Sequence, residues 1–247
     1  MTDRWPKKGP RWDAEVVATA AALAANDAAT TGKLHAVTRT ALDRIWKVQR
    51  KDGGFTWIDC DWPPMESDDD FGVALAAIAV GLAPEKYAET RAAKEGLAGL
   101  KKFLAKNPAP TLHHRAMWLW AATMLPEFMS KSERERTIAD LLAKQLPGGG
   151  WSAASLGNWR RADGSPQSEK EADGYGTGFA LYVLRKAGVP ANDARIAKGA
   201  EWLKREQKAS GRWYTRSLFR DGKHYLSHVG TAFAVMALAE CEKAGGW

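Results

Sequence analysis

The sequence has 247 residues, a formal net charge of +7 and a pI near 9.4, with 45% hydrophobic and 26% charged residues. This composition excludes a disordered chain, and the length allows a substantial hydrophobic core. Twelve tryptophans indicate recurrent aromatic packing, an aromatic-lined cavity, or both. We expect a single domain over residues 1–247, in which residues 1–11 form a flexible N-terminal extension.

Charge and cysteine usage narrow the range of partners. The lysines and arginines are distributed along helix faces, which is typical of a solvated surface, so no nucleic-acid partner is expected. Cys60 and Cys241 lie far apart without a CxxC motif, which indicates neither a disulfide framework nor a zinc knuckle. No cofactor or bound metal is expected. With no signal-peptide pattern and no apolar run of about 18 residues, we expect a soluble or peripheral protein; its compartment stays open.

Helical periodicity runs through the chain, and strand patterns are scarce. The predicted helices are, in chain order, 12–27, 33–49, 68–83, 89–106, 112–125, 131–145, 173–187, 193–207 and 226–243. Two kinds alternate: some are apolar on nearly every side, as in FGVALAAIAVGLA (71–83) and GTAFAVMALAE (230–240), and others are amphipathic, as in AAKEGLAGLKKFLAK (92–106). Because a helix that is apolar all round must be buried all round, the alternation predicts inner helices wrapped by outer ones.

Three of the outer helices end in a similar way. The segments are RTALDRIWKVQRKDGGFTW (39–57), RTIADLLAKQLPGGGW (136–151) and KGAEWLKREQKASGRW (198–213). Each places a glutamine (Gln49, Gln145, Gln207), then glycine and then an aromatic residue after the helix. Glycine supplies the left-handed residue that stops a helix, and we expect the glutamine amide to bond a neighbouring helix end. Recurrence at a few tens of residues indicates a repeat architecture.

These turns resemble the glutamine–tryptophan repeats of squalene–hopene cyclases and related terpenoid cyclases, which share an α/α toroid with prenyltransferase β subunits. The likeness is strongest over residues 171–213 and extends over most of the chain from about residue 33. It implies an all-α fold of the α/α-toroid type, in which inner and outer helices alternate. The nine predicted helices are fewer than a complete toroid contains.

Successive inner helices of such a barrel run in the same direction, so their N-termini gather at one rim. The helix starts MESDDDFG (65–72), TLHHRAMW (111–118), EADGYGTG (171–178) and YLSHVGTA (225–232) bring polar side chains there. The residues expected at the rim are Glu66, Asp68, Asp69, Asp70, His113, His114, Asp173, Tyr175, Tyr225 and His228. Helix N-termini favour negative charge. Five aromatic residues either line a lumen or pack in the core: Trp118, Trp120, Phe179, Tyr182 and Phe233. Of these, we expect Trp118 to contact the ligand.

The resemblance assigns a role to the acidic run. Class II terpenoid cyclases carry an Asp-x-Asp-Asp signature at an inner-helix start, whose central aspartic acid protonates an alkene or epoxide. Glu66-Ser67-Asp68-Asp69 is similar to that signature, which makes Asp68 the candidate catalytic acid, with Asp69 and Glu66 beside it. Crowded carboxylates raise the pKa of one of them. The alternative is helix capping by Ser67 or Asp68.

Two classes of function follow. In the first, the protein acts on an apolar isoprenoid through acid catalysis by Asp68. In the second, a non-catalytic toroid binds a lipid, peptide or protein partner at the acidic and histidine-bearing rim. Peripheral membrane contact, a divalent metal held by Asp68, Asp69, His113 and His228, and the oligomeric state stay open. The long polar segments 50–66 and 150–171 both lead into an inner-helix start, so each is expected to form a lid or partner surface, or else a mobile excursion.

Overall fold

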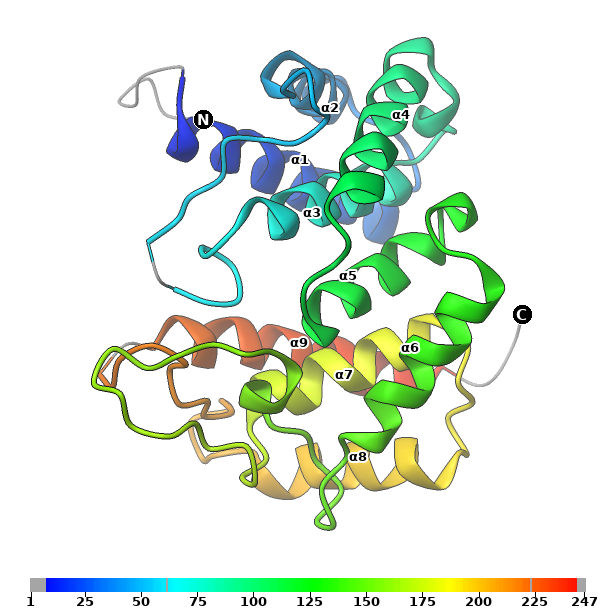
Figure 1. Ribbon diagram of the computed structural model, residues 1–247. Coiled ribbons are helices and arrows are strands. Elements are labelled where there is room, and N and C mark those ends of the chain that lie inside the picture. The colour runs from blue at the N-terminus through cyan, green and yellow to red at the C-terminus, as the bar shows by residue number, and fades with distance from the viewer. Residues whose placement is uncertain (1–7, 61, 223, 244–247) are drawn as a thin grey trace. The chain divides into compact units, whose positions relative to one another are not determined.

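The computed structural model describes residues 8–60, 62–222 and 224–243 and is all-helical over them, with no β-strand. All nine helices expected from the sequence are present, with their ends moved by a few residues (Figure 1). They are α1 Pro10–Thr30, α2 Ala36–Val48, α3 Asp69–Leu82, α4 Arg91–Lys106, α5 Leu112–Ala122, α6 Lys131–Ala143, α7 Gly174–Lys186, α8 Ala194–Glu206 and α9 Tyr225–Glu242. Short 3-10 helices are η1 Tyr87–Glu89, η2 Pro126–Phe128 and η3 Ala153–Leu156.

The N-terminal end differs from the expected extension. Helix α1 already begins at Pro10, where proline suits the first helical position, so residues 10 and 11 are helical. Residues 1–7 of that extension lie outside the described residues. Within the described ranges, no helix combines the length and the apolar character that crossing a bilayer requires.

The described residues pack as two compact units. Unit 1 is formed by Met1–Pro110 with Ala121–Met129, and unit 2 by Thr111–Trp120 with Ser130–Trp247. Helix α5 therefore contributes its first nine residues to unit 2 and its last two to unit 1. Each unit is described separately below, and the expectation of a single domain stays a prediction.

Unit 1 is built around two apolar helices, α1 and α3. Helix α1 packs against α3, and α2 packs against α1, α3 and α4. Most side chains of α3 are buried, whereas α4 buries one face only, through Ala93, Gly96, Leu97, Leu100 and Phe103. The two kinds of helix expected from the sequence therefore differ in burial as well as in composition.

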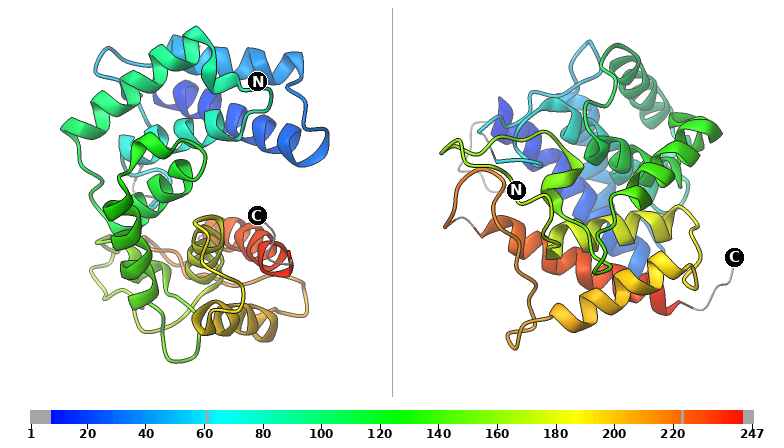
Figure 2. Two further views of the ribbon diagram at one scale, coloured as in Figure 1. Left: turned by 90° about the vertical axis from the view of Figure 1, so that its right-hand side faces the viewer. Right: turned by 60° about the horizontal axis from the view of Figure 1, so that its bottom comes forward.

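Unit 2 is built around α5, α7 and α9, which run in the same direction. His113 lies beside Tyr175, and seven residues further along both helices Trp120 lies against Tyr182, with ring centroids 5.1 Å apart. Between α7 and α9, a Cβ on Gly178 would lie 2.6 Å from the Ala234 nitrogen, so only glycine allows this approach. Helix α8 packs against both α7 and α9 (Figure 2). The N-termini of three inner helices therefore lie at one end of unit 2.

The last apolar helix departs from expectation. Helix α7 buries every residue from Gly174 to Leu184, but α9 buries only one side. Val235 of α9 is 56% exposed, and Ala232 and Ala239 on the same side are exposed as well. Within unit 2, the expected burial of segment 230–240 on every side is therefore not found, because no described element of this unit covers that side of α9.

The glutamine turns join neighbouring outer helices. Gln49 Nε2 donates to the carbonyl of Gly53 in its own turn and to the carbonyl of Gly96 in α4, both at 3.0 Å. Gln145 Nε2 donates in the same way to Gly149 and to Arg195 in α8, both at 2.7 Å. The expected bond from the glutamine amide to a neighbouring helix is therefore present in two of the three turns.

Candidate functional site

The acidic run at the start of α3 in unit 1 is tied to the backbone. Asp68 is the N-cap of α3: its carboxylate accepts the Phe71 N–H at 3.1 Å and the Ser67 hydroxyl at 3.1 Å. Asp69 accepts the Trp57 N–H at 3.1 Å and forms an ion pair with Arg50 at 2.6 Å. Asp68 therefore acts as a helix N-cap, and Asp69 joins α3 to the loop that contains Arg50 and Trp57.

Glu66 precedes this run in a turn, where its N–H donates to the Trp62 carbonyl at 3.0 Å. The Cys60 thiol donates to the Glu66 carboxylate at 2.9 Å. A fourth acid of unit 1, Asp13 of α1, is not among the residues that the sequence pattern indicates. It accepts the Thr56 N–H at 3.0 Å, and burial raises its pKa. In unit 1 the acids at the starts of α1 and α3 therefore hold the loop that follows Gln49.

Asp173 has the corresponding position in unit 2, at the start of α7. As the N-cap of α7 it accepts the Gly176 N–H at 2.8 Å. The Ala153 N–H and the Thr215 hydroxyl also donate to it, at 2.7 Å and 3.1 Å. Burial raises the pKa of Asp173 to about 6, against the lowering effect of these hydrogen bonds. The effect of burial therefore exceeds that of the hydrogen bonds, and part of this carboxyl group is protonated near pH 6.

His113 and Tyr175 form a buried pair next to Asp173. His113 Nε2 and the Tyr175 hydroxyl are 2.7 Å apart. The Phe179 ring stacks on the His113 ring with centroids 4.5 Å apart. Burial raises the pKa of Tyr175 well above its ordinary range, and Asp173 and Tyr225 act in the same direction. The structure therefore brings four predicted rim residues of unit 2 together, including Tyr225.

Of the other predicted residues of unit 2, His114 lies against His113, with ring centroids 5.7 Å apart, and Trp118 and His228 have other surroundings. His114 is buried, and its Nδ1 lies 2.8 Å from the Thr111 hydroxyl at the start of α5. Trp118 is buried in the core, and His228 is exposed on α9. Asp68 and Asp69 belong to unit 1, so their meeting with His113 and His228 around one opening stays a prediction.

A small pocket opens beside Asp173 within unit 2. Its volume is about 80 Å³, room for a few water-sized groups at roughly 10–15 Å³ each. The lining residues come from the segment before α7 and from the segment between α8 and α9: Ser152, Ala154, Gln167, Ser168, Glu171, Ala172, Asp173, Tyr214, Arg216, Ser217 and Leu218. Tyr214 is 56% exposed at its edge. The pocket combines two carboxyl groups with several hydroxyls and a few apolar side chains.

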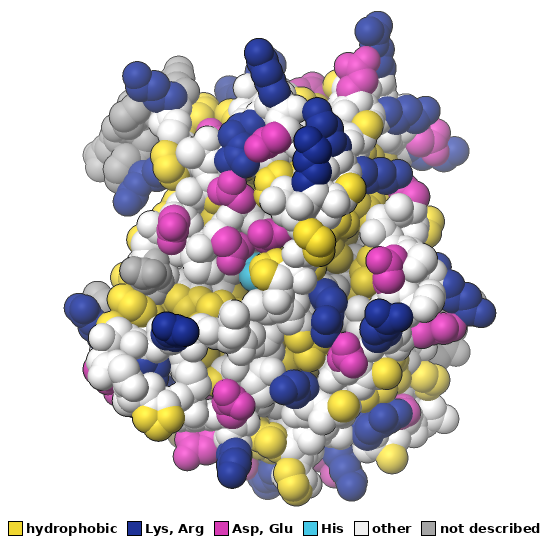
Figure 3. Space-filling view, in the orientation of Figure 1, with side chains coloured by type: hydrophobic (Ala, Val, Ile, Leu, Met, Phe, Trp, Pro, Cys, Tyr) yellow, Lys and Arg dark blue, Asp and Glu magenta, His cyan; other side chains and the backbone are white. Residues whose placement is uncertain are grey.

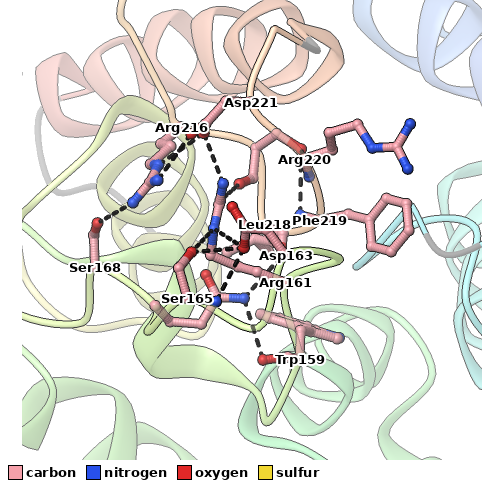
Figure 4. A network of polar contacts seen from close by, with 12 residues as sticks. Trp159, Arg161, Asp163, Ser165, Ser168, Arg216, Leu218, Phe219, Arg220 and Asp221 are labelled. Carbon is pink, nitrogen blue, oxygen red and sulfur yellow. Dashed lines mark hydrogen bonds and ion pairs between the residues drawn. The ribbon is translucent and has the colours of Figure 1, made fainter.

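The two segments that line the pocket are locked together (Figure 4). Arg161 has a fully buried side chain, which pairs with Asp221 at 2.8 Å and donates to the Ser217 carbonyl at 2.7 Å. Arg216 also donates two hydrogen bonds to the Asp221 carboxylate, at 2.8 and 2.9 Å, and a third to the Ser168 hydroxyl. These guanidinium groups, Arg216 first, hold the pKa of Asp221 well below its usual range. The segment 150–171 therefore borders the pocket, and ion pairs and hydrogen bonds join it to the segment between α8 and α9.

Sequence reasoning missed this lock. Trp159-Arg160-Arg161 reads as a pair of solvated arginines, and nothing local marks Arg161 as buried. Gln167 completes the lock by donating to the carbonyls of Trp159 and Leu218, at 3.1 and 2.7 Å. Arg161 has its partners in the segment between α8 and α9, which only the folded chain brings near.

No group of three or more His, Cys, Asp or Glu side chains is placed to hold a metal ion within the described ranges. On the face shown in Figure 3, lysine and arginine side chains are interspersed with acids rather than joined in one basic strip. In comparisons with known proteins, no protein-family model and no curated protein matches this chain.

Proposed function

We propose that the helices form a partial or complete α/α toroid, the fold type that the resemblance implies. Two observations support this: apolar and amphipathic helices alternate along the chain, and the glutamine turns bond one outer helix to the next. The shared direction of α5, α7 and α9 is the arrangement that gathers inner-helix N-termini at one rim.

For function, we propose a binding protein whose site is the pocket beside Asp173. The observation that carries this is the convergence of a carboxyl group of raised pKa with a pocket that two locked segments hold open. Perturbed carboxyl groups in pockets are typical of functional sites. This develops the non-catalytic alternative, in which a partner or lipid-like molecule is bound at the acidic rim of the inner helices.

The chemistry of the walls selects the ligand. Asp173 and Glu171 are hydrogen-bond acceptors when charged, whereas the cation of Arg216 is already paired with Asp221. A hydrogen-bond donor is therefore the complementary group. We expect a small ligand, or the head of a larger one, that carries an ammonium or hydroxyl group.

The test is NMR titration of the labelled protein with a panel of small amines, polyols and carboxylates. We expect an amine or polyol to shift the backbone amides of Ala154, Ala172 and Leu218. Asp68→Asn is the matched control, because Asp68 caps α3 as Asp173 caps α7 but lies in unit 1. Binding should survive Asp68→Asn and weaken at least tenfold in Asp173→Asn. If only carboxylates bound at these amides, the proposed ligand class would be wrong.

Protonation of an apolar isoprenoid is the second candidate function. One observation favours it, the raised pKa of Asp173, which keeps part of this carboxyl protonated near pH 6. The catalytic acid would then be Asp173 in place of Asp68, and the pocket would hold the end of the isoprenoid that is protonated. Incubation with squalene at pH 6, followed by mass spectrometry of the extract, tests this. Cyclic isomers that disappear with Asp173→Asn and persist with Asp68→Asn would support it, and their absence would contradict it.

A further inference from the structure

Unit 1 contains a groove along α4, whereas the pocket beside Asp173 belongs to unit 2. The volume of this groove is about 410 Å³, within the roughly 300–1,000 Å³ that small-molecule sites occupy. Its walls come from η1, from one face of α4 and from the turn after α5. We call it the α4 groove, and its walls include Lys94, Leu97, Ala98, Lys101, Met124 and Glu127. Every lining residue belongs to unit 1, so the shape of the α4 groove depends on the packing of that unit.

The floor of the α4 groove is apolar. Leu97 of α4 and Leu125 of the turn after α5 are 5% and 6% exposed, so both pack into unit 1 and close the floor. Met124 lies against α3, where a Cβ on Gly81 would come within 2.9 Å of the Met124 Cβ. Because Gly81 has no side chain, the turn after α5 can approach α3 this closely. An apolar part of a ligand would therefore contact Leu97, Ala98 and Met124.

Four charged side chains line the α4 groove, and three of them are already paired. Lys101 forms an ion pair with Glu127 at 3.5 Å, and Glu89 of η1 forms one with Lys86 at 3.7 Å. Lys94 is exposed, and it has no ion-pair or hydrogen-bond partner among the described residues. The α4 groove therefore combines an apolar floor with one positive charge that no carboxylate balances.

We propose that the α4 groove binds an amphiphilic carboxylate, a small molecule that carries one carboxylate group on an apolar chain. The carboxylate pairs with Lys94, because the other charged side chains of the groove have partners. The apolar chain lies along Leu97 and Ala98 towards Lys101. Seven residues of helix separate the two lysines and span ~10 Å, so a chain of medium length reaches from one to the other. The ligand is a free molecule in solution.

The probe is sodium octanoate, which has one carboxylate group and an apolar chain of medium length. Octylammonium carries a similar chain with a positive charge, and octanol carries one without charge. Binding is followed by NMR of protein that is labelled with carbon-13 at the methionine methyl groups. The Met124 methyl is the reporter, and that of Met117, which is buried in unit 2, is the reference.

Octanoate should shift the Met124 methyl signal and bind more tightly than octylammonium or octanol. Lys94→Gln should weaken octanoate binding by about three- to fivefold, the effect of one exposed ion pair. Lys94→Glu should reverse the preference towards octylammonium, which a merely destabilised protein would not do. Lys102→Gln is the matched control, because Lys102 is an exposed lysine of α4 outside the groove.

A second pair of variants tests the place of the apolar chain. Ala98→Leu fills the α4 groove with a larger side chain, so octanoate should no longer shift the Met124 methyl signal. Ala105→Leu is the matched control, because Ala105 is also exposed on α4 but does not line the groove. It should leave octanoate binding unchanged.

Several results would overturn the proposal. Octanoate that leaves the Met124 methyl signal unmoved would remove the site, and equal binding of octanoate and octylammonium would remove the charge argument. A shift that survives Ala98→Leu would place the ligand elsewhere. Co-sedimentation with phosphatidylglycerol vesicles that Lys94→Gln abolishes, without a shift from free octanoate, would assign the α4 groove to a membrane surface instead.

Discussion

The two acids at the start of α3, Asp68 and Asp69, differ in the groups that their carboxylates contact. Asp68 accepts bonds from the Ser67 hydroxyl and the Phe71 N–H at the start of α3. Asp69 reaches across to Arg50 and to the Trp57 N–H, which joins α3 to the loop after Gln49. Neighbouring residues in one acidic run therefore have different structural roles.

This difference predicts different costs of substitution. Asp68→Asn should change the free energy of unfolding by a few tenths of a kcal/mol, because asparagine also caps helices. Asp69→Asn should lower it by about 1–2 kcal/mol, because it leaves the partly buried Arg50 without this carboxylate. Urea denaturation of the two variants measures both values. Equal losses would contradict the separate roles.

The pKa of Asp173 predicts a pH dependence. Its pKa of about 6 in the folded protein lies above the ordinary 3.8, so the folded state binds this proton more tightly than the unfolded state. The contribution of Asp173 to the free energy of unfolding is therefore greatest below about pH 4 and is lost as the pH rises through about 6. Carbon-13 NMR titration of the labelled Asp173 carboxyl should give a midpoint near 6. A midpoint at or below 4 would contradict the effect of burial.

At this scale the sequence predicts the local contacts and misses the distant ones. Asp68 and Asp173 could be placed at helix starts because a cap depends on the few residues that follow it. The pairs Arg50–Asp69 and Arg161–Asp221 could not be predicted, because each partner sits in a different segment. Nor does any local pattern indicate that the arginine at position 161 is buried.

At the scale of elements, the glutamine turns act as bridges between outer helices. Gln145 makes two short bonds, one within its turn and one to α8, whereas Gln207 makes one within the described part of the chain. Gln145→Leu should therefore lower the free energy of unfolding by about 1–2 kcal/mol, and Gln207→Leu by under about 0.5 kcal/mol. Thermal or chemical denaturation of the two variants compares them directly. A larger loss of stability for Gln207→Leu than for Gln145→Leu would contradict this difference between the two turns.

The positions of the helices could be predicted from the periodicity of the sequence, but the burial of each helix could not. The alternation of apolar and amphipathic segments located all nine helices, because the pattern repeats within each helix. The helices α7 and α9 are similarly apolar, yet α7 is buried from Gly174 to Leu184 and α9 exposes Val235. Which side of a helix is covered depends on its neighbours, and composition does not record them.

At the scale of the whole molecule, the chain crosses between its units within α5. Residues 111–120 pack in unit 2, and residues 121–129 return to unit 1. The sequence shows no linker at this point, since the helix continues through it. Repeat spacing predicts the class of architecture, but it does not predict where packing divides a continuous array of helices.

The division into two units also separates the polar residues that the sequence predicts at one rim. Within unit 2, His113, Asp173, Tyr175 and Tyr225 gather as the shared helix direction predicts. The pocket itself depends on the lock between the segments around Arg161 and Arg216, which no repeat pattern describes. The sequence therefore predicts at which end of the inner helices the candidate site lies, but it does not predict the pocket itself.

Native mass spectrometry of the purified protein, compared with its Ala154→Leu variant, tests the proposed binding site most directly. Ala154 lines the pocket and is almost fully buried, so leucine fills the space beside Asp173. After incubation with the amine or polyol that NMR identifies, the unchanged protein should carry one bound molecule and the variant none. Equal occupancy of the two proteins, or none in either, would contradict a ligand site in this pocket.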